Sequence, residues 1–122
     1  MLDLIIKNGQ CYIDGELKEV DVSVKDEKIQ GIGKITEEAK DIIDAKGLIV
    51  LPGCIDTQTH FREPGSTDTE DLHSGSRAAI VGGITAVFEM PNTNPPTSTK
   101  KEFQKKLDLA KNRMYCNYAF YF

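Results

Sequence analysis

Short apolar runs alternate with tight-turn dipeptides through residues 1 to 51. Val20, Val22 and Val24 are separated by polar residues, and this period of two predicts a half-buried strand because side chains two positions apart share a face. Three dipeptides typical of hairpin turns separate the β-prone runs: Asn8-Gly9, Asp14-Gly15 and Asp26-Glu27. We expect at least five short strands here. The segment contains no histidine, so we assign it a structural role.

Beyond residue 52 the pattern changes to strands alternating with helices. Apolar residues at helical spacing follow two sequences that have the form of a capping box, Thr67-x-x-Glu70 and Thr99-x-x-Glu102. These predict helices that begin after Thr67 and after Thr99. Glycines at 82 and 83 are expected to end the first helix, and Asn112 the second. β-prone runs lie before, between and after the two helices.

This order of elements is typical of a parallel α/β sheet with right-handed crossovers. Two helices and three strands cannot close a barrel, and the aromatic last strand would leave an exposed sheet edge. We therefore expect the N-terminal part of a larger protein. The alternative is a small complete domain that pairs its edges in an oligomer.

Composition narrows the classes of function. The 122 residues are 39% hydrophobic and 28% charged, with a net charge of −4 and an isoelectric point near 5.1. Basic residues are dispersed, which argues against nucleic-acid binding. No apolar run is long enough for a membrane span, and the start lacks the pattern of a signal peptide, so we expect a cytoplasmic protein. Three cysteines without a C-x-x-C pair indicate neither a disulfide framework nor a thiolate zinc site.

Candidate chemistry is concentrated between Pro52 and Gly65. On an extended strand, Asp56, Gln58, His60 and Arg62 would project to one side. Four polar groups that converge at a strand end suggest a binding site. The alternative is an edge strand with its polar face in solvent.

Several motifs together resemble the amidohydrolase superfamily, and within it dihydroorotase most. The likeness extends over essentially the whole chain, and its motifs are specific when taken together. Allantoinases share the Arg-Glu-Pro-Gly stretch but differ near Met-Pro-Asn-Thr, and hydantoinases usually lack the arginine. The matching residues are Pro52-Gly53, Ile55-Asp56, His60, Arg62-Glu63-Pro64-Gly65, Gly75-Ser76-Arg77-Ala78-Ala79, Gly82-Gly83-Ile84-Thr85, Met90-Pro91-Asn92-Thr93 and Pro95.

The resemblance implies an α/β architecture. Residues 1–51 would belong to a small β-sandwich domain, and residues 52–122 would form the first β-α-β-α-β of a metal-dependent (β/α)8 TIM barrel. The implied reaction interconverts N-carbamoyl-L-aspartate and dihydroorotate in pyrimidine biosynthesis. It implies zinc, one or two ions in the full-length protein, and a small-molecule substrate with a carboxylate. A homo-oligomer or a pyrimidine-pathway enzyme partner is also expected, with no nucleic acid or membrane.

By position in the motifs, Arg62 and Asn92 match the residues that bind the substrate carboxylate, and His60 matches a metal ligand. Arginine suits a carboxylate because its planar fork binds both oxygens. The alternatives are a surface salt bridge for Arg62 and a turn for Asn92. Asp56 lies on the same face and could bind the metal, and we favour for it the role of orienting His60 through a hydrogen bond. No catalytic residue is assigned in this segment, since the other family ligands would lie on later strands, and the 122 residues alone are expected to be inactive.

The sequence departs from the family at Gln58, where the first histidine of a His-x-His pair is expected. An amide oxygen is a poor zinc ligand, so we expect reduced metal occupancy. Two other functions therefore stay open: a cyclic ureide hydrolase such as an allantoinase or hydantoinase, and a non-catalytic homologue acting as a structural partner. His73 is expected to pack in the first helix. Acidic residues near that helix's start are expected to favour its N-terminus: Asp68, Glu70 and Asp71.

Overall fold

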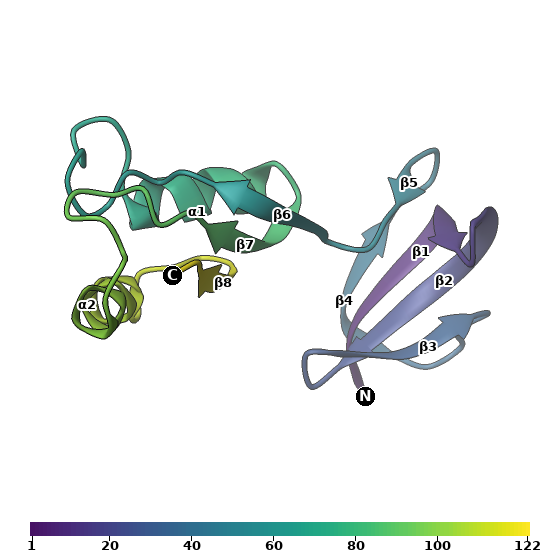
Figure 1. Ribbon diagram of the computed structural model, residues 1–122. Helices are drawn as coiled ribbons and strands as arrows, with labels where there is room; N and C mark the ends of the chain where they lie inside the picture. The colour runs from purple at the N-terminus through teal and green to yellow at the C-terminus, as the bar shows by residue number, and fades with distance from the viewer. The chain divides into compact units, whose positions relative to one another are not determined.

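The structure is a computed structural model that describes residues 1–122. The chain forms two compact units, Met1–Pro52 and Gly53–Phe122 (Figure 1). The boundary lies between Pro52 and Gly53, where the sequence pattern changes. None of the helices has both the length and the apolar composition needed to cross a membrane.

The N-terminal unit is a single mixed sheet. Its strand order is β3-β2-β1-β4, and β5 also pairs with β1. β1 to β3 form an antiparallel meander, whereas β4 and β5 both run parallel to β1. The expected strands are thus present, while the sandwich stays a prediction for the whole protein. The strands are β1 Leu2–Ile13, β2 Glu16–Lys25, β3 Lys28–Gly33, β4 Ala39–Asp44 and β5 Ile49–Val50.

Two of the three predicted hairpin turns are confirmed. Asp14-Gly15 and Asp26-Glu27 both have positive φ at the two central positions, as a two-residue hairpin turn requires. The third prediction is wrong, because β1 continues through Asn8-Gly9 as a bulge with a register shift after Ile6. Asn8 takes the left-handed φ of 61° there. A Cβ on Gly9 would lie 2.5 Å from Val50 Cγ2, so the close approach of β5 also requires glycine.

The C-terminal unit confirms the alternation of strands and helices. Its three strands are all parallel, in the order β6-β7-β8. In Figure 1 they point the same way, and the loops that follow β6 and β7 lie at that end of the unit. This is the arrangement in which functional side chains gather at the carboxyl ends of strands. The elements are β6 Cys54–Thr59, α1 Leu72–Val81, β7 Ile84–Glu89, α2 Lys100–Ala110 and β8 Asn117–Phe120.

The first helix begins later than predicted. Asp71, not Thr67, is its N-cap, and Asp71 and Ser74 form a reciprocal capping box. These bonds, led by the Ser74 backbone N–H, lower the pKa of the Asp71 carboxyl. Residues 67 to 69 form a turn instead, because the amides of Thr69 and Glu70 donate to the Ser66 carbonyl.

The other predicted helix signals are confirmed. Thr99 caps α2 by accepting a hydrogen bond of 3.2 Å from the Glu102 amide. Left-handed residues follow the ends of both helices, Gly83 with φ 84° and Asn112 with φ 60°. Local sequence therefore predicts the C-terminal ends of α1 and α2 and the N-terminal start of α2.

The core of the C-terminal unit fixes the loop that follows β6. Phe61 is buried among α1, β7 and the chain after α2, and it meets helix α1 at a glycine. A Cβ on Gly75 would lie 2.4 Å from the Phe61 ring, so a side chain there would displace it. His60 therefore directly precedes a residue, Phe61, whose side chain is fixed in the core. The buried cluster comprises Phe61, Leu72, Val87, Ala110 and Cys116.

Candidate functional site

The candidate site lies where β6 and β7 end. His60 directly follows β6, and Asn92 lies in the loop after β7. Because the two strands are parallel neighbours, their carboxyl ends meet at the same edge of the sheet. His60 Nδ1 lies 2.9 Å from Asn92 Oδ1. The structure therefore brings together two of the residues that the sequence analysis singled out.

This contact determines which nitrogen of His60 is available. An amide oxygen can only accept a hydrogen bond, so in the neutral ring the proton belongs on Nδ1, and Nε2 is the nitrogen that can accept or bind a metal. The Asn92 amide group keeps both of its N–H donors for another partner. A free imidazole nitrogen beside a free amide donor suits a metal ligand next to a binding group for a substrate oxygen.

Asp56 and Gln58 are placed differently from the expected pattern. The Asp56 carboxylate accepts a hydrogen bond of 2.9 Å from the Gln58 backbone amide. The β6–β7 register also shifts between Asp56 and Thr59. The hydrogen-bonding role that we assigned to Asp56 is thus taken by Asn92, and the exposed Gln58 side chain has no hydrogen-bonding partner.

Arg62 does not continue the alternation of the strand. β6 ends at Thr59, and Arg62 lies in the following loop with a left-handed φ of 62°. Its carbonyl accepts from the Ser66 amide at 2.9 Å, while its exposed guanidinium takes part in none of the ion pairs of the chain and in no hydrogen bond. The prediction that Arg62 shares one strand face with Asp56, Gln58 and His60 is therefore wrong. It assumed that the strand continues to Arg62, whereas β6 ends at Thr59. An unpaired guanidinium is free to bind an anion.

A buried carboxylate to which the sequence analysis assigned no role, that of Glu63, holds the same loop in place. Glu63 is 6% exposed and pairs with both nitrogens of the Arg113 fork, at 2.8 and 3.1 Å. Its Oε2 also accepts from the Leu72 amide at 2.9 Å, at the start of α1. The bond to Glu63 raises the pKa of Arg113. Glu63 therefore ties the site loop to α1 and to the chain after α2.

A second buried pair, Glu89 with Lys106, lies at the end of β7. Burial raises the pKa of the Glu89 carboxyl, although the Lys106 ammonium acts to lower it. No local sequence pattern predicts this pair, because a lysine on an amphipathic helix and a glutamate at a strand end are typical surface residues.

The residues of this chain do not by themselves fit a metal ion. They contain no group of three or more histidine, cysteine, aspartate or glutamate side chains arranged to hold one. His60 offers one nitrogen, and zinc sites in proteins take three or four ligands. The other histidine, His73, contacts the Tyr115 hydroxyl at 3.2 Å and packs against its ring, in line with a packing role.

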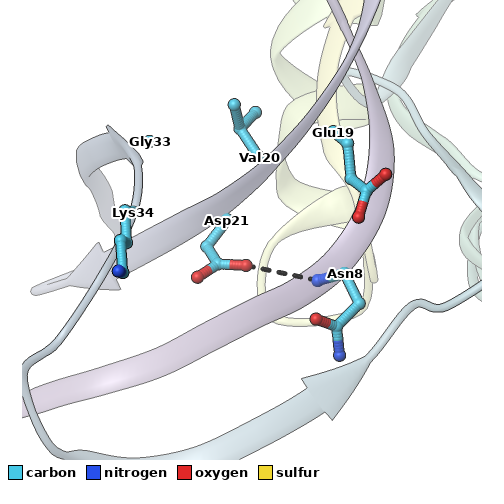
Figure 2. A pocket seen from close by; sticks show the side chains of 6 residues that line it. All are labelled: Asn8, Glu19, Val20, Asp21, Gly33 and Lys34. Carbon is cyan, nitrogen blue, oxygen red and sulfur yellow. Dashed lines mark hydrogen bonds between the residues drawn. The ribbon is translucent and has the colours of Figure 1, made fainter.

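The N-terminal unit has a hollow in which the polar side chain of Asp21 is bonded to backbone amides (Figure 2). Asp21 accepts hydrogen bonds there from the amides of Asn8, at 3.2 Å, and Ile35, at 3.5 Å. The carboxylate thus supports the β1 bulge, and we assign the hollow a structural role. It is lined by Asn8, Glu19, Val20, Asp21, Gly33 and Lys34.

Comparison with known proteins identifies the family. Residues 49–121 match the model of the amidohydrolase family, and the chain belongs to that family. It is 46% identical over 113 residues to an allantoinase of Escherichia coli O1:K1 / APEC, a match that covers 92% of this chain and 25% of that protein. The chain thus spans about a quarter of the length of the curated relatives it matches.

Solved structures agree with this assignment. An L-hydantoinase (dihydropyrimidinase) from Arthrobacter aurescens superimposes with a TM-score of 0.89 and 36% identity, covering 99% of this chain and 28% of that one. A D-hydantoinase from Thermus sp. gives 0.80 and 30%, covering 97% and 27%. The expected superfamily and its mixed α/β fold are confirmed. The narrower assignment to dihydroorotase is not supported, since these relatives are allantoinases and hydantoinases.

Proposed function

We propose that the protein containing these residues is a cyclic ureide hydrolase of the allantoinase or hydantoinase type. The observation that carries the proposal is the His60–Asn92 contact of 2.9 Å at the carboxyl ends of β6 and β7. It occurs in a chain that is 46% identical to an allantoinase. Hydrolysis of a cyclic amide agrees with the family to which the chain belongs. We propose in addition that the cyclic amide is a ureide.

The chemistry of such a ring is simple to balance. Water adds to a ring carbonyl and the C–N bond breaks. One proton of the water goes to the nitrogen, and the other is released when the new acid on the opened chain ionises to a carboxylate. In our proposal the Asn92 amide donates to an oxygen of the substrate, and the same residue's carbonyl orients His60. His60 Nε2 is the one metal ligand that this segment supplies. We propose zinc as the metal, with its other ligands on parts of the protein outside residues 1–122.

A second candidate is hydrolysis of dihydroorotate, and Arg62 favours it. Dihydroorotate carries a carboxylate before its ring opens, whereas the rings of allantoin and hydantoin carry none. The unpaired, exposed guanidinium of Arg62 would suit that carboxylate, with Asn92 as its neighbour on the substrate. In a ureide hydrolase the same guanidinium would meet the new carboxylate of the product.

A third candidate, a non-catalytic homologue, is favoured by Gln58 alone. A neutral amide in place of a ligand histidine weakens metal binding. Such a protein would bind a pyrimidine-pathway enzyme or assemble with its own copies, and it would have no use for a free imidazole nitrogen beside an amide donor.

The experiment uses the full-length protein purified with added zinc. It is incubated with allantoin, hydantoin and dihydroorotate, and the ring-opened acids are separated by chromatography. We expect opening of a cyclic ureide, lost in His60→Ala and kept in the control His73→Ala, since the His73 ring pairs with Tyr115 and not with His60 or Asn92. Absence of ring opening with all three compounds would favour the non-catalytic candidate.

A further inference from the structure

A fully buried ion pair lies behind the candidate site. Glu89 is the last residue of β7, Lys106 lies in α2, and their side chains are 1% and 0% exposed. The Lys106 ammonium contacts Glu89 Oε2 and also lies 5.1 Å from the centre of the Phe120 ring. Removing two charges from water is costly, and an apolar pair of similar volume is often as stable. Stability alone is therefore a weak explanation for this pair.

Each partner also holds the backbone of one site loop. Glu89 Oε1 accepts from the Phe61 amide at 3.3 Å, and Phe61 directly follows His60. The Lys106 ammonium donates to the Met90 carbonyl at 3.0 Å, two residues before Asn92. The two bonds thus end next to the two residues whose side chains meet at the site.

We propose that Glu89 and Lys106 are a positioning pair that sets the spacing of the two loops and so holds His60 against Asn92. Neither side chain reaches the solvent-exposed edge where a substrate would bind, because both are buried. The pair acts through the backbone of the loops. The inference rests on the proposed function to the extent that the His60–Asn92 contact serves catalysis.

The test is a double variant of the full-length protein, Glu89→Leu with Lys106→Met. It removes both charges together, so no buried charge is left unpaired. The apolar side chains have similar volume, and they form no hydrogen bond to either loop. The matched control is Glu102→Leu with Lys105→Met, which removes the neighbouring ion pair of 3.0 Å from the same helix. That pair is partly exposed and contacts neither loop.

Three quantities are measured: Tm, kcat/KM on the ring that the unmodified protein opens, and the nitrogen-15 signals of His60 in metal-free protein, assigned by their loss in His60→Gln. We expect both double variants to keep Tm within a few degrees. In the Glu89 and Lys106 variant alone, kcat/KM should fall about 10- to 100-fold. Its His60 signals should change from one tautomer, protonated on Nδ1, to a mixture.

A folded double variant with unchanged kcat/KM and a single His60 tautomer would overturn the proposal. If that variant does not fold, Glu89→Gln with Lys106→Met keeps an acceptor for the Phe61 amide and still releases the Met90 carbonyl. A fall in kcat/KM is expected there too, and unchanged values would contradict the proposal. If the unmodified protein opens no ring, the proposed function fails, and the tautomer signals still decide whether the pair positions His60.

Discussion

His60 Nδ1 and Asn92 Oδ1 lie 2.9 Å apart although 32 residues separate them in the chain. The contact depends on the parallel pairing of β6 with β7, since each residue lies just beyond the end of one strand. It also determines the imidazole tautomer. The candidate site is therefore a property of the β-α-β unit and not of one motif.

Asn92→Ala should reduce activity without unfolding the protein. Asn92 is exposed, so the protein should tolerate the change. The substitution removes both the oxygen that accepts from His60 and the amide N–H groups that we expect to contact substrate. Loss of a group that orients a ligand histidine typically costs about 10- to 100-fold in activity. Steady-state kinetics of the full-length protein measure the loss. Gln104→Ala, which removes an exposed amide from α2, should leave kcat/KM unchanged.

Arg62→Ala should distinguish the candidate substrates. If the guanidinium binds a substrate carboxylate, kcat/KM on dihydroorotate should fall roughly 30-fold or more, equivalent to about 2 kcal/mol. The effect on neutral rings should be smaller, because they offer no anion before the ring opens. Arg77→Ala removes an exposed arginine from α1 and serves as the control. Equal kinetics for Arg62→Ala and the unmodified protein on every ring would exclude Arg62 from the site.

Gln58→His should raise the metal content. An imidazole binds zinc far better than an amide, so the unmodified full-length protein should hold nearer one zinc than two per chain. Elemental analysis of protein purified without added metal gives the ratio. Chelation followed by re-addition of zinc should abolish and restore activity. Two tightly held zinc ions in both proteins would show that another residue has taken the place of the missing histidine.

Arg113→Met should destabilise the C-terminal unit. The change leaves the buried Glu63 carboxylate without its two bonds to the guanidinium, and an unsatisfied buried acceptor costs about 1 to 3 kcal/mol. Denaturant unfolding measures the free energy, and amide exchange at Leu72 reports the start of α1, where Glu63 also accepts. Arg77→Met, with no such partner, should leave the unfolding free energy within error.

Local sequence predicted the features that depend on local chemistry. The Asp14-Gly15 turn and the Thr99 cap are set by residues within one turn of the chain. The parallel sheet follows from the alternation of strands and helices, and it places His60 and Asn92 at one edge. These are the parts of the fold and site that were predictable.

The remaining features depend on contacts distant in sequence. Asn8-Gly9 has the composition of a hairpin turn, but pairing with β2 and the approach of β5 make it a bulge. Arg62 leaves the strand face because β6 ends at Thr59, and strand ends are poorly marked by composition. The burial of Lys106 depends on Glu89 and Phe120, which no local pattern relates to it.

The most direct test of the proposed function is the ratio of kcat/KM for allantoin and hydantoin to kcat/KM for dihydroorotate, measured on the zinc-loaded full-length protein. We predict that a cyclic ureide is opened with the higher kcat/KM. A higher kcat/KM for dihydroorotate, or no opening of any of the three rings, would contradict the account.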